Sequence, residues 1–506
     1  MAEAKKDRTK WILLGLLLGI LMSAMDNTIV TTAMGTIVSE LGGMEQFVWV
    51  TSAYMVAVMA GTPIFGKLSD MYGRKSFFIF GIITFLLGSV LCGMATSIVQ
   101  LSIFRAIQGV GGGALMPIAF TIIYDIFPVE KRGKMTGLMG AVFGTSSIFG
   151  PLLGAFITDS LGWNWVFYIN VPIGLVSLLL IVLCYKESMI RASQRIDWGG
   201  AFTLVGAVVC LMFALELGGE KFAWNSSLII GLFTGFIVLF AIFLLVERKA
   251  SEPIISFDMF HNRLYATSSL LALLYGSVFI VATVYIPIYV QGVFGGTATN
   301  SGLILMPMMI GSVVGSMLGG MLTSRMSYRS IMSISVVFFI AGIFALSTLH
   351  GDSARSLLTM YSIVAGFGVG FSFSVLGMAA VHPFDMQRRG AATSTNSFLR
   401  SLGMTLGITI FGIVQRNLMT RGMEDAFPGM AGAAEQFGDT REALSPEKRA
   451  LIPPEILQGI VDAMSSSIAH TFMWALLPAA LSILVVLAMP GDRLSSIVSD
   501  KTKQGA

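Results

Sequence analysis

Charged side chains are scarce in this chain. Lysine, arginine, aspartate and glutamate together make up 12% of the 506 residues, whereas hydrophobic residues make up 55%. Soluble domains carry roughly 25% charged residues. Water therefore cannot be the main solvent around this chain. The composition excludes an ordinary soluble protein and indicates that lipid surrounds most of the chain.

Cysteine and histidine are also rare. The three cysteines, Cys92, Cys184 and Cys210, each lie in an apolar run and show no CxxC spacing. The four histidines lie apart from one another, near the ends of apolar runs (His261, His350, His382, His470). A disulfide framework or a metal site needs ligands at characteristic spacings. We therefore expect no disulfide, no bound metal and no cofactor.

Patterns of soluble enzymes are incomplete here. Residues 61–67 mimic a phosphate-binding loop, but Leu68 stands where that loop needs Ser or Thr. Residues 109–114 mimic a dinucleotide fingerprint, but they lie in an apolar run without a strand–helix–strand unit. The net charge of +4 is spread over several loops and forms no single basic patch. We therefore expect neither an enzyme nor a nucleic-acid-binding protein.

Long apolar runs dominate what is present. A bilayer core of about 30 Å is crossed by about 20 mostly apolar residues in a helix. The runs of this kind are 11–34, 48–66, 76–95, 101–124, 135–158, 165–186, 198–217, 226–246, 265–291, 300–323, 330–349, 356–381, 391–414 and 468–489. The first run is too long for a signal peptide, so we expect it to remain. The sequence predicts an all-α polytopic membrane protein with fourteen transmembrane helices.

Basic residues alternate between the two sides of the membrane. Lys and Arg gather in every second loop, as at 5–10, 67–75 and 131–134, whereas the intervening loops hold few. Cytoplasmic loops carry an excess of Lys and Arg. The alternation therefore predicts cytoplasmic termini and an even number of helices. Two arginines, Arg105 and Arg400, lie inside predicted helices instead of in loops.

The two halves of the chain resemble each other weakly. Residues 66–75 have an echo at 320–329, and residues 127–133 have one at 382–390. Transporters are often built from repeated halves. We expect a six-helix bundle, an inserted hairpin of two helices, and a second six-helix bundle with a long outer loop; their ranges are 1–190, 191–250, 251–506 and, for the loop, 415–467. Within that loop, residues 455–464 form either a short amphipathic helix at the membrane surface or part of a solvated loop.

The loop between the second and third predicted helices reads GKLSDMYGRKS. So short a connection needs glycine, here Gly66 and Gly73, where helices end. Asp70 can meet the positive N-terminal end of a helix, which we expect near Gly390. The positive-inside rule accounts for Arg74 but not for the aspartate and both glycines. The pattern resembles the loop signature of the major facilitator superfamily, which implies a gate latch made of these residues.

The fifth predicted helix carries Gly144, Gly150, Pro151 and Gly154. Proline removes a helix hydrogen bond, and small residues let a neighbouring helix approach. By itself this chemistry indicates only a bent, closely packed helix. The pattern resembles the signature that is peculiar to antiporters of the same superfamily, and the resemblance implies export rather than uptake.

Two ionisable residues lie deep inside predicted helices. Arg105 lies in the fourth, in the segment LSIFRAIQG, and Asp26 lies in the first. A charge at such depth is costly in lipid, needs a partner, and is functional by default. The two residues form either a proton-coupling pair or a purely structural ion pair, and the rarity of such residues in lipid favours the former. The segment around Arg105 resembles a third signature of the superfamily.

The residues around Asp26 read MDNTIV and resemble the first-helix signature of the fourteen-helix drug:proton antiporter family, the quaternary-ammonium and multidrug efflux pumps. The match covers nearly the whole chain, and its further segments are 49–54, 163–172, 195–197 and 389–400. The chain departs from the family at Thr31, Gly35 and Asn164. These departures concern local helix geometry and substrate range.

This resemblance implies a proton-coupled antiporter that exports lipophilic, often cationic drugs by alternating access. Its partners would be such small molecules, protons and the lipid bilayer, and we expect a monomer in the bacterial cytoplasmic membrane. Candidate substrate-binding residues are polar or aromatic side chains in the helices (Asn27, Tyr54, Phe143, Glu216, Tyr285, Phe371). Three alternatives remain: a dedicated exporter of one antibiotic, metabolite or lipid, a proton-coupled importer, and a membrane scaffold that transports nothing.

Overall fold

The computed structural model describes residues 2–42, 48–187, 196–219, 221–296, 298–427, 449 and 452–493. Contacts divide these residues into two units. Unit 1 holds the chain up to Ser269 together with Leu376–Leu399, and unit 2 holds Leu270–Val375 together with the described residues from Arg400 onward. The predicted domain boundary between 190 and 191 lies outside the described residues.

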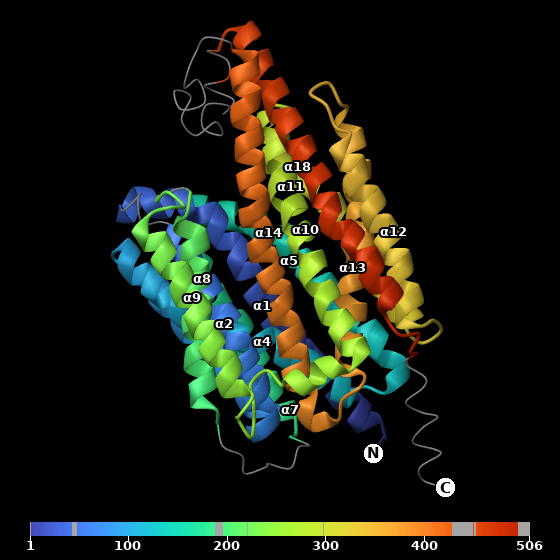
Figure 1. The fold of residues 1–506 in the computed structure, drawn as a ribbon. Coiled ribbons are helices and arrows are strands. Elements are labelled where there is room, and N and C mark those ends of the chain that lie inside the picture. Colours follow the sequence, from blue (N-terminus) through green and yellow to red (C-terminus); the bar gives the residue numbers. More distant parts are fainter. Residues whose placement is uncertain are drawn as a thin grey trace. The chain divides into compact units, whose positions relative to one another are not determined.

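Helices account for the secondary structure of both units. In chain order they are α1 (Ala2–Leu41), α2 (Val48–Tyr72), α3 (Arg74–Gly93), α4 (Ile98–Ile126), α5 (Val129–Leu161), α6 (Trp165–Tyr168), α7 (Asn170–Cys184), α8 (Trp198–Leu217), α9 (Ser227–Glu247), η1 (Phe257–His261), α10 (Arg263–Gly292), α11 (Ala298–Leu322), α12 (Tyr328–Ser347), α13 (Arg355–Val381), η2 (Met386–Arg388), α14 (Arg389–Ala426) and α18 (Pro454–Ala488). Over the described residues no β-strand forms (Figure 1). Fourteen helices in the same residues are long and apolar enough to cross a membrane, which confirms the predicted number.

Capping side chains fix where several helices begin. Ser97 accepts a hydrogen bond from the Gln100 backbone N–H at the start of α4, at 3.3 Å. Asp197 accepts one from the Gly200 N–H at the start of α8, at 2.8 Å. The first N–H groups of a helix have no partner within the helix, and these side chains satisfy one of them. Polar residues at the borders of apolar runs therefore set the ends of the membrane-spanning helices.

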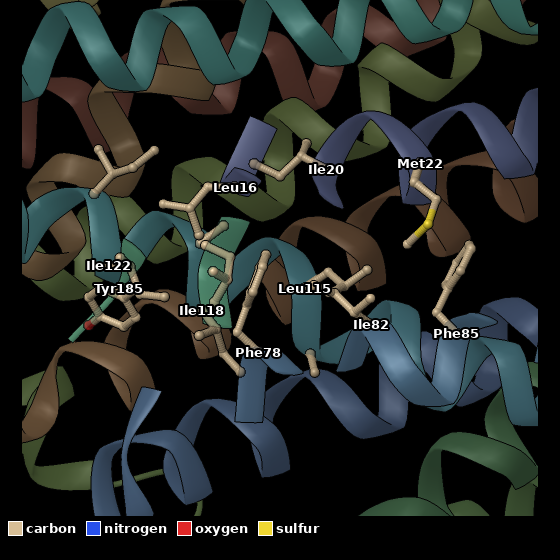
Figure 2. Close-up of a cluster of buried hydrophobic side chains, with 14 of the residues drawn as sticks. Leu16, Ile20, Met22, Phe78, Ile82, Phe85, Leu115, Ile118, Ile122 and Tyr185 are labelled. Atoms are coloured by element: carbon tan, nitrogen blue, oxygen red, sulfur yellow. The ribbon is translucent and has the colours of Figure 1, made fainter. Parts of the chain in front are cut away.

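The core of unit 1 lies where α1, α3 and α4 meet. Fully buried aliphatic and aromatic side chains from these helices pack together, and Tyr185, just after α7, closes the cluster (Figure 2). The labelled members are Leu16, Ile20, Met22, Phe78, Ile82, Phe85, Leu115, Ile118, Ile122 and Tyr185. Many other large apolar side chains on the outer helix faces are exposed. That distribution is expected for helices whose outer faces contact lipid.

The inserted pair of helices, α8 and α9, packs side by side and joins unit 1 through α2 (Figure 1). The ring of Phe213 on α8 lies edge-on to that of Trp49 on α2, with centroids 4.7 Å apart. Lys67 near the end of α2 forms a 2.6 Å ion pair with Glu252, which follows α9. The hairpin is therefore attached at both ends of α2, as a peripheral addition to unit 1.

Unit 2 contains its own set of packed helices. α12 lies along α18 (Figure 1). Inside the unit, the rings of Tyr275 on α10 and Phe339 on α12 stack at 4.5 Å, and the hydroxyl groups of Tyr275 and Ser335 lie 3.0 Å apart. Ser335 in turn donates to the Gly368 carbonyl on α13, at 2.8 Å. Aromatic stacking and buried hydroxyl bonds thus connect α10, α12 and α13.

The helices around the long outer loop differ from the prediction. α14 continues to Ala426 and α18 begins at Pro454, so helix occupies both ends of the loop predicted at 415–467. Residues 455–464 are the first turns of α18 and form neither a separate surface helix nor a solvated loop. The apolar pattern marked only the lipid-facing part of each helix, and hydrogen bonding along the backbone continues beyond it. Residues 428–448 lie outside the described chain.

Candidate functional site

A fully buried ion pair lies inside unit 1. Asp26 on α1 and Arg105 on α4 both have 0% of their side chains exposed, and Arg105 Nη1 lies 2.5 Å from Asp26 Oδ2. The pairing expected from the sequence is therefore present. A charge-assisted hydrogen bond of this kind is short and strong, and its buried position limits screening by water.

Two amide side chains complete the surroundings of Asp26. Gln108 Nε2 on α4 donates to Asp26 Oδ1 at 2.8 Å, and Asn170 Nδ2 on α7 donates to the same oxygen at 2.9 Å. Both amides also donate to the hydroxyl of Ser89 on α3, at 2.7 and 3.1 Å. Asp26 thus accepts hydrogen bonds from one cation and two amides, which come from two different helices.

Arg105 is held from the opposite side by α2. Its guanidinium carbon lies 4.0 Å from the centre of the Tyr54 ring, and Nε donates to the Val50 carbonyl at 3.3 Å. Nη1 also donates to Gln108 Oε1 at 2.7 Å. An aromatic face attracts a guanidinium. Tyr54, predicted to contact substrate, therefore lies in direct contact with the charge pair.

Three members of this cluster were not singled out from the sequence. Gln108 lies one helical turn after Arg105, a spacing that places both on the same face of α4, so this signal was available. Asn170 lies in the segment 163–172, whose resemblance to the antiporter family could have drawn attention to it. A serine in an apolar helix is not unusual, so the sequence did not mark Ser89 as a functional residue. Its hydrogen bond with Gln108 in the folded protein identifies it.

A second charged cluster surrounds Asp70 near the end of α2. Its two carboxylate oxygens accept hydrogen bonds from the backbone N–H groups of Gly390 and Ala391, each at 2.9 Å, at the start of α14. The expected contact with a helix N-terminus near Gly390 is present. Negative charge is stabilised at that end of a helix because unpaired N–H groups and the helix dipole point toward it.

Arginines link this cluster to α4. Arg74 Nη2 lies 3.3 Å from Asp70 Oδ1 and donates to the Met386 carbonyl at 2.5 Å. Arg74 also forms an ion pair with Asp125 at the end of α4, and Arg389 donates to the same carboxylate at 2.8 Å. Asp125 is therefore part of the cluster.

Glycines allow the backbone around this cluster to approach closely. A Cβ atom on Gly66 would overlap the Ser394 side chain on α14 and would lie 2.8 Å from the Gly390 carbonyl oxygen. Gly73 has φ of 106°, a conformation that suits glycine, and α3 begins at the next residue. The four residues of the predicted latch thus have distinct parts: two glycines shape the chain and two charges make the contacts.

The glycines predicted in the fifth helix face α1. A Cβ on Gly150 would overlap the Thr28 hydroxyl, and one on Gly154 would overlap that of Thr32 and lie 2.7 Å from the Ile29 carbonyl oxygen. Gly144 is buried and Pro151 lies inside α5. This face therefore holds α5 against α1, the helix that carries Asp26.

The other substrate candidates have varied surroundings. Asn27 is half-buried on α1, and Glu216 is half-buried on α8. Tyr285 on α10 is buried and donates to the Phe411 carbonyl at 3.4 Å, while Phe371 on α13 packs edge-on against Phe367. The side chain of Phe143 lies outside the described structure. Among the members of this set whose side chains are described, Tyr54 contacts the guanidinium of Arg105.

Metal binding finds no support in these clusters. No group of three or more His, Cys, Asp or Glu side chains in the part of the chain that the structure describes is arranged to hold a metal ion. Both clusters consist of carboxylates paired with arginine or backbone N–H groups.

Comparison with known proteins identifies the family. The family model described as Major Facilitator Superfamily matches residues 16–198 and 198–408. The chain belongs to the Major Facilitator Superfamily. As a member, it is a multi-pass membrane transporter and not an enzyme.

Relatives within this superfamily are named for drug transport. The chain is 59% identical to "Multidrug resistance protein 3" of Bacillus subtilis (strain 168), over 99% of both chains. It is 34% identical to "Multidrug transporter protein MdtP" of the same organism, over 95% of this chain and 91% of that protein.

Solved facilitator structures share the fold. The proton:xylose symporter XylE matches with a TM-score of 0.62 at 15% identity, over 97% of this chain and 99% of that one. A bacterial homologue of the human lysosomal transporter Spinster matches with a TM-score of 0.55 at 17% identity, over 96% and 98%. At such identities the likeness concerns the fold alone.

Proposed function

We propose that this facilitator-superfamily protein is a proton-coupled antiporter that exports lipophilic, often cationic drugs from a bacterial cell. It would lie in the cytoplasmic membrane as a monomer, with both termini in the cytoplasm, as the distribution of Lys and Arg predicts. The names of the two Bacillus subtilis relatives support a broad range of drugs as substrates. The observation that carries proton coupling is the buried Asp26 cluster.

Proton coupling is supported by the hydrogen bonds that the Asp26 carboxylate accepts. Arg105 occupies Oδ2, and Gln108 and Asn170 both donate to Oδ1. A proton that binds the carboxylate turns one of its oxygens into a donor, so it competes with these contacts. Protonation would therefore weaken the hold on Arg105, whose guanidinium also contacts Tyr54 on α2. The protonation state of one carboxylate thus acts on α1, α2, α4 and α7.

Exchange requires that proton and substrate exclude each other. In the proposed cycle, Asp26 loses its proton toward the cytoplasm as substrate binds and takes a proton from outside as substrate leaves. The two halves of the transporter rock around the site, which opens alternately to either side. Asp70 stabilises one end of this cycle by its contact with the start of α14, and Arg74 does so by its hydrogen bond to the Met386 carbonyl in η2.

Direction is supported by α5. Its glycine face, which packs on α1, resembles the antiporter signature of the superfamily, so we favour export over import. A dedicated exporter of one antibiotic, metabolite or lipid would share the same clusters. A screen of structurally unrelated drugs in everted membrane vesicles with an imposed proton gradient separates a broad exporter from a dedicated one.

The test of proton coupling is Asp26→Asn. Asparagine keeps the shape of the side chain and one acceptor oxygen, while Arg105 keeps Gln108, Val50 and the Tyr54 ring, so the protein should reach the membrane in normal amount. Uphill accumulation of a cationic drug in everted vesicles should disappear. Proton release when a cationic drug binds to the detergent-solubilised protein should disappear as well.

The matched control is Asp159→Asn, because Asp159 is an exposed carboxylate on α5. This variant should pump and release protons like the wild type. If Asp26→Asn still pumps against a gradient with unchanged pH dependence, Asp26 is only a structural partner of Arg105. The proposed coupling site would then be wrong, and Glu216 would be the next carboxylate to examine.

A further inference from the structure

Arg400 is a second arginine inside a membrane-spanning helix. It lies on α14, roughly 16 Å along the helix axis from Arg389 at 1.5 Å per residue. It belongs to unit 2, like the helices α10 and α13 that it contacts. Arginine at such depth is costly and is usually paired with an acid, with backbone carbonyls or with a functional ligand.

The protein neighbours of Arg400 carry no charge. Nη2 donates to the Ser372 carbonyl at 3.0 Å, and Nη1 lies 3.3 Å from the Ser372 hydroxyl. The guanidinium carbon lies 4.8 Å from the centre of the Phe373 ring. Among the ion pairs formed between described residues, none includes Arg400. Its positive charge is therefore not compensated by a carboxylate in the described structure.

The backbone that carries Arg400 is fixed by close packing. A Cβ on Gly276 of α10 would overlap the Arg400 carbonyl oxygen, and one on Gly403 would overlap the Leu273 carbonyl. Only glycine permits this approach of α10 and α14. The guanidinium is thus presented from a rigid scaffold, which limits its ability to escape toward water.

An anion with an aromatic body fits these surroundings. A guanidinium presents five N–H donors in a planar fork, and the contacts to Ser372 use two of them. Arg400 is half-buried, so part of the residue remains accessible to a ligand. Carboxylates match the fork with two parallel hydrogen bonds. The Phe373 ring meets the Phe279 ring edge-on at 5.4 Å, and together they supply an apolar, aromatic wall beside the charge.

We propose that Arg400, Phe373 and Phe279 form an anion-binding site for the carboxylate of an aromatic, amphiphilic substrate. The transporter would then accept organic anions and zwitterions as well as cations. The assignment deepens the export function proposed above and rests on it, but binding can be measured without a proton gradient. The hydrogen bonds to Ser372 orient the guanidinium and leave its remaining donors for the ligand.

The test uses two fluorescent probes that share a pyrenylalkyl body and carry head groups of opposite charge. The anion is 1-pyrenebutyrate, and the cation is 4-(1-pyrenyl)butyltrimethylammonium. Both are titrated onto the full-length protein in detergent at one pH and one salt concentration. Arg400→Gln should weaken pyrenebutyrate binding roughly ten- to hundredfold, the loss expected for a charge-assisted hydrogen bond. Binding of the cation should change by no more than about twofold or become tighter.

Arg355→Gln is the matched control. Arg355 on α13 is exposed, donates to the Phe294 carbonyl at 3.3 Å and lies 5.6 Å from the Phe294 ring. It therefore has the same kinds of contacts as Arg400 without burial, and its removal should leave both probes bound as in the wild type. Arg400→Lys should weaken the anion less than Arg400→Gln, because it keeps the charge but loses the fork.

Several results would overturn the proposal. These are absence of pyrenebutyrate binding to the wild type, unchanged anion binding in folded Arg400→Gln, and an equal loss of both probes, which would indicate a structural role. If Arg400→Gln does not fold, the same criteria apply to Arg400→Lys. Loss of proton coupling is read separately in the Asp26→Asn vesicles, so failure of the anion site and failure of the export function are distinguishable.

Discussion

Two buried arginines show how differently the two units treat the same side chain. In unit 1, Arg105 is wholly buried and forms an ion pair with Asp26 inside a network of amides. In unit 2, Arg400 is half-buried, and its guanidinium contacts Ser372 and Phe373 with no acid partner among the described residues. Both stack on an aromatic ring, so the ring does not distinguish them. The presence of an acid partner distinguishes them. Arg105 and Asp26 together carry no net charge, whereas Arg400 keeps a positive charge that a ligand can pair with.

The largest expected difference comes from the same substitution at both arginines. Arg105→Gln leaves the Asp26 carboxylate buried with amide partners only, which costs about 3–5 kcal/mol. Arg400→Gln removes a charge without an acid partner, so its effect on the free energy of unfolding should stay within about 1 kcal/mol. Thermal unfolding of the purified proteins in detergent measures both.

The double variant Asp26→Asn with Arg105→Gln serves as control for this contrast. It removes both charges together and should recover most of the stability that Arg105→Gln loses. Equal losses for the two single variants would mean that Arg400 also has an acid partner, and the difference between the units would disappear.

A smaller effect is expected from close helix packing, which also differs between the units. In unit 1 a Cβ on Gly150 would meet the Thr28 side chain, whereas in unit 2 a Cβ on Gly403 would meet the Leu273 backbone carbonyl. A side chain can shift more easily than a helix backbone. Gly403→Ala should therefore cost about 1–3 kcal/mol, and Gly150→Ala should cost less.

Gly302→Ala provides the reference for these glycine variants, because no atom lies within 4 Å of a Cβ at that helical position. It should stabilise the protein by up to about 1 kcal/mol, through helix propensity alone. Midpoints of thermal unfolding give the order of the three variants. A loss for Gly150→Ala larger than that for Gly403→Ala would contradict the distinction between side chain and backbone.

The smallest effect on stability is expected at Asp70, whose contacts include two backbone N–H groups. Asp70→Asn keeps an acceptor oxygen but loses the charge at the start of α14 and toward Arg74, which should cost about 1 kcal/mol. Substrate binding should persist while export slows. Flux in everted vesicles, compared with drug binding in detergent, measures the two separately.

Asp258→Asn is the corresponding control, since Asp258 is an exposed aspartate of η1 in the same unit. It should transport like the wild type and unfold within about 0.5 kcal/mol of it. Wild-type export by Asp70→Asn would reduce the loop to a topology signal.

Several parts of the site were accessible from the sequence because a rule of chemistry pointed to them. Asp26 and Arg105 were paired by depth alone, since few ionisable residues lie inside the apolar runs. Asp70 was assigned to a helix N-terminus near Gly390 for the same kind of reason. Gln108 and Asn170 were missed, because a neutral amide costs less to bury than a charge and is therefore less conspicuous in an apolar helix.

The number of membrane-spanning helices could be predicted from the sequence, but the ends of some helices could not. Apolar runs of sufficient length predicted the fourteen helices that, within the described residues, are long and apolar enough to cross a membrane, yet they ended α14 too early and started α18 too late. Hydrophobicity reports the solvent around a residue, whereas a helix is defined by backbone hydrogen bonds, which continue into water. The sequence left two interpretations for residues 455–464, a surface helix and a solvated loop. Both are wrong, because these residues are the first turns of the membrane-spanning helix α18.

The amino-acid sequence by itself determined that the protein lies in a membrane, where its helices run, and which ionisable residues lie inside those helices. These properties depend on local composition. Only the tertiary structure decided which charges are neutralised. Arg105 and Arg400 are the same residue in similarly apolar helices, and no acidic residue lies within one turn of either. The carboxylate that neutralises Arg105 comes from α1, far away in the chain, whereas α10 and α13 bring Arg400 only rings and a serine. Pairing over such separations depends on how helices pack, which local sequence does not specify.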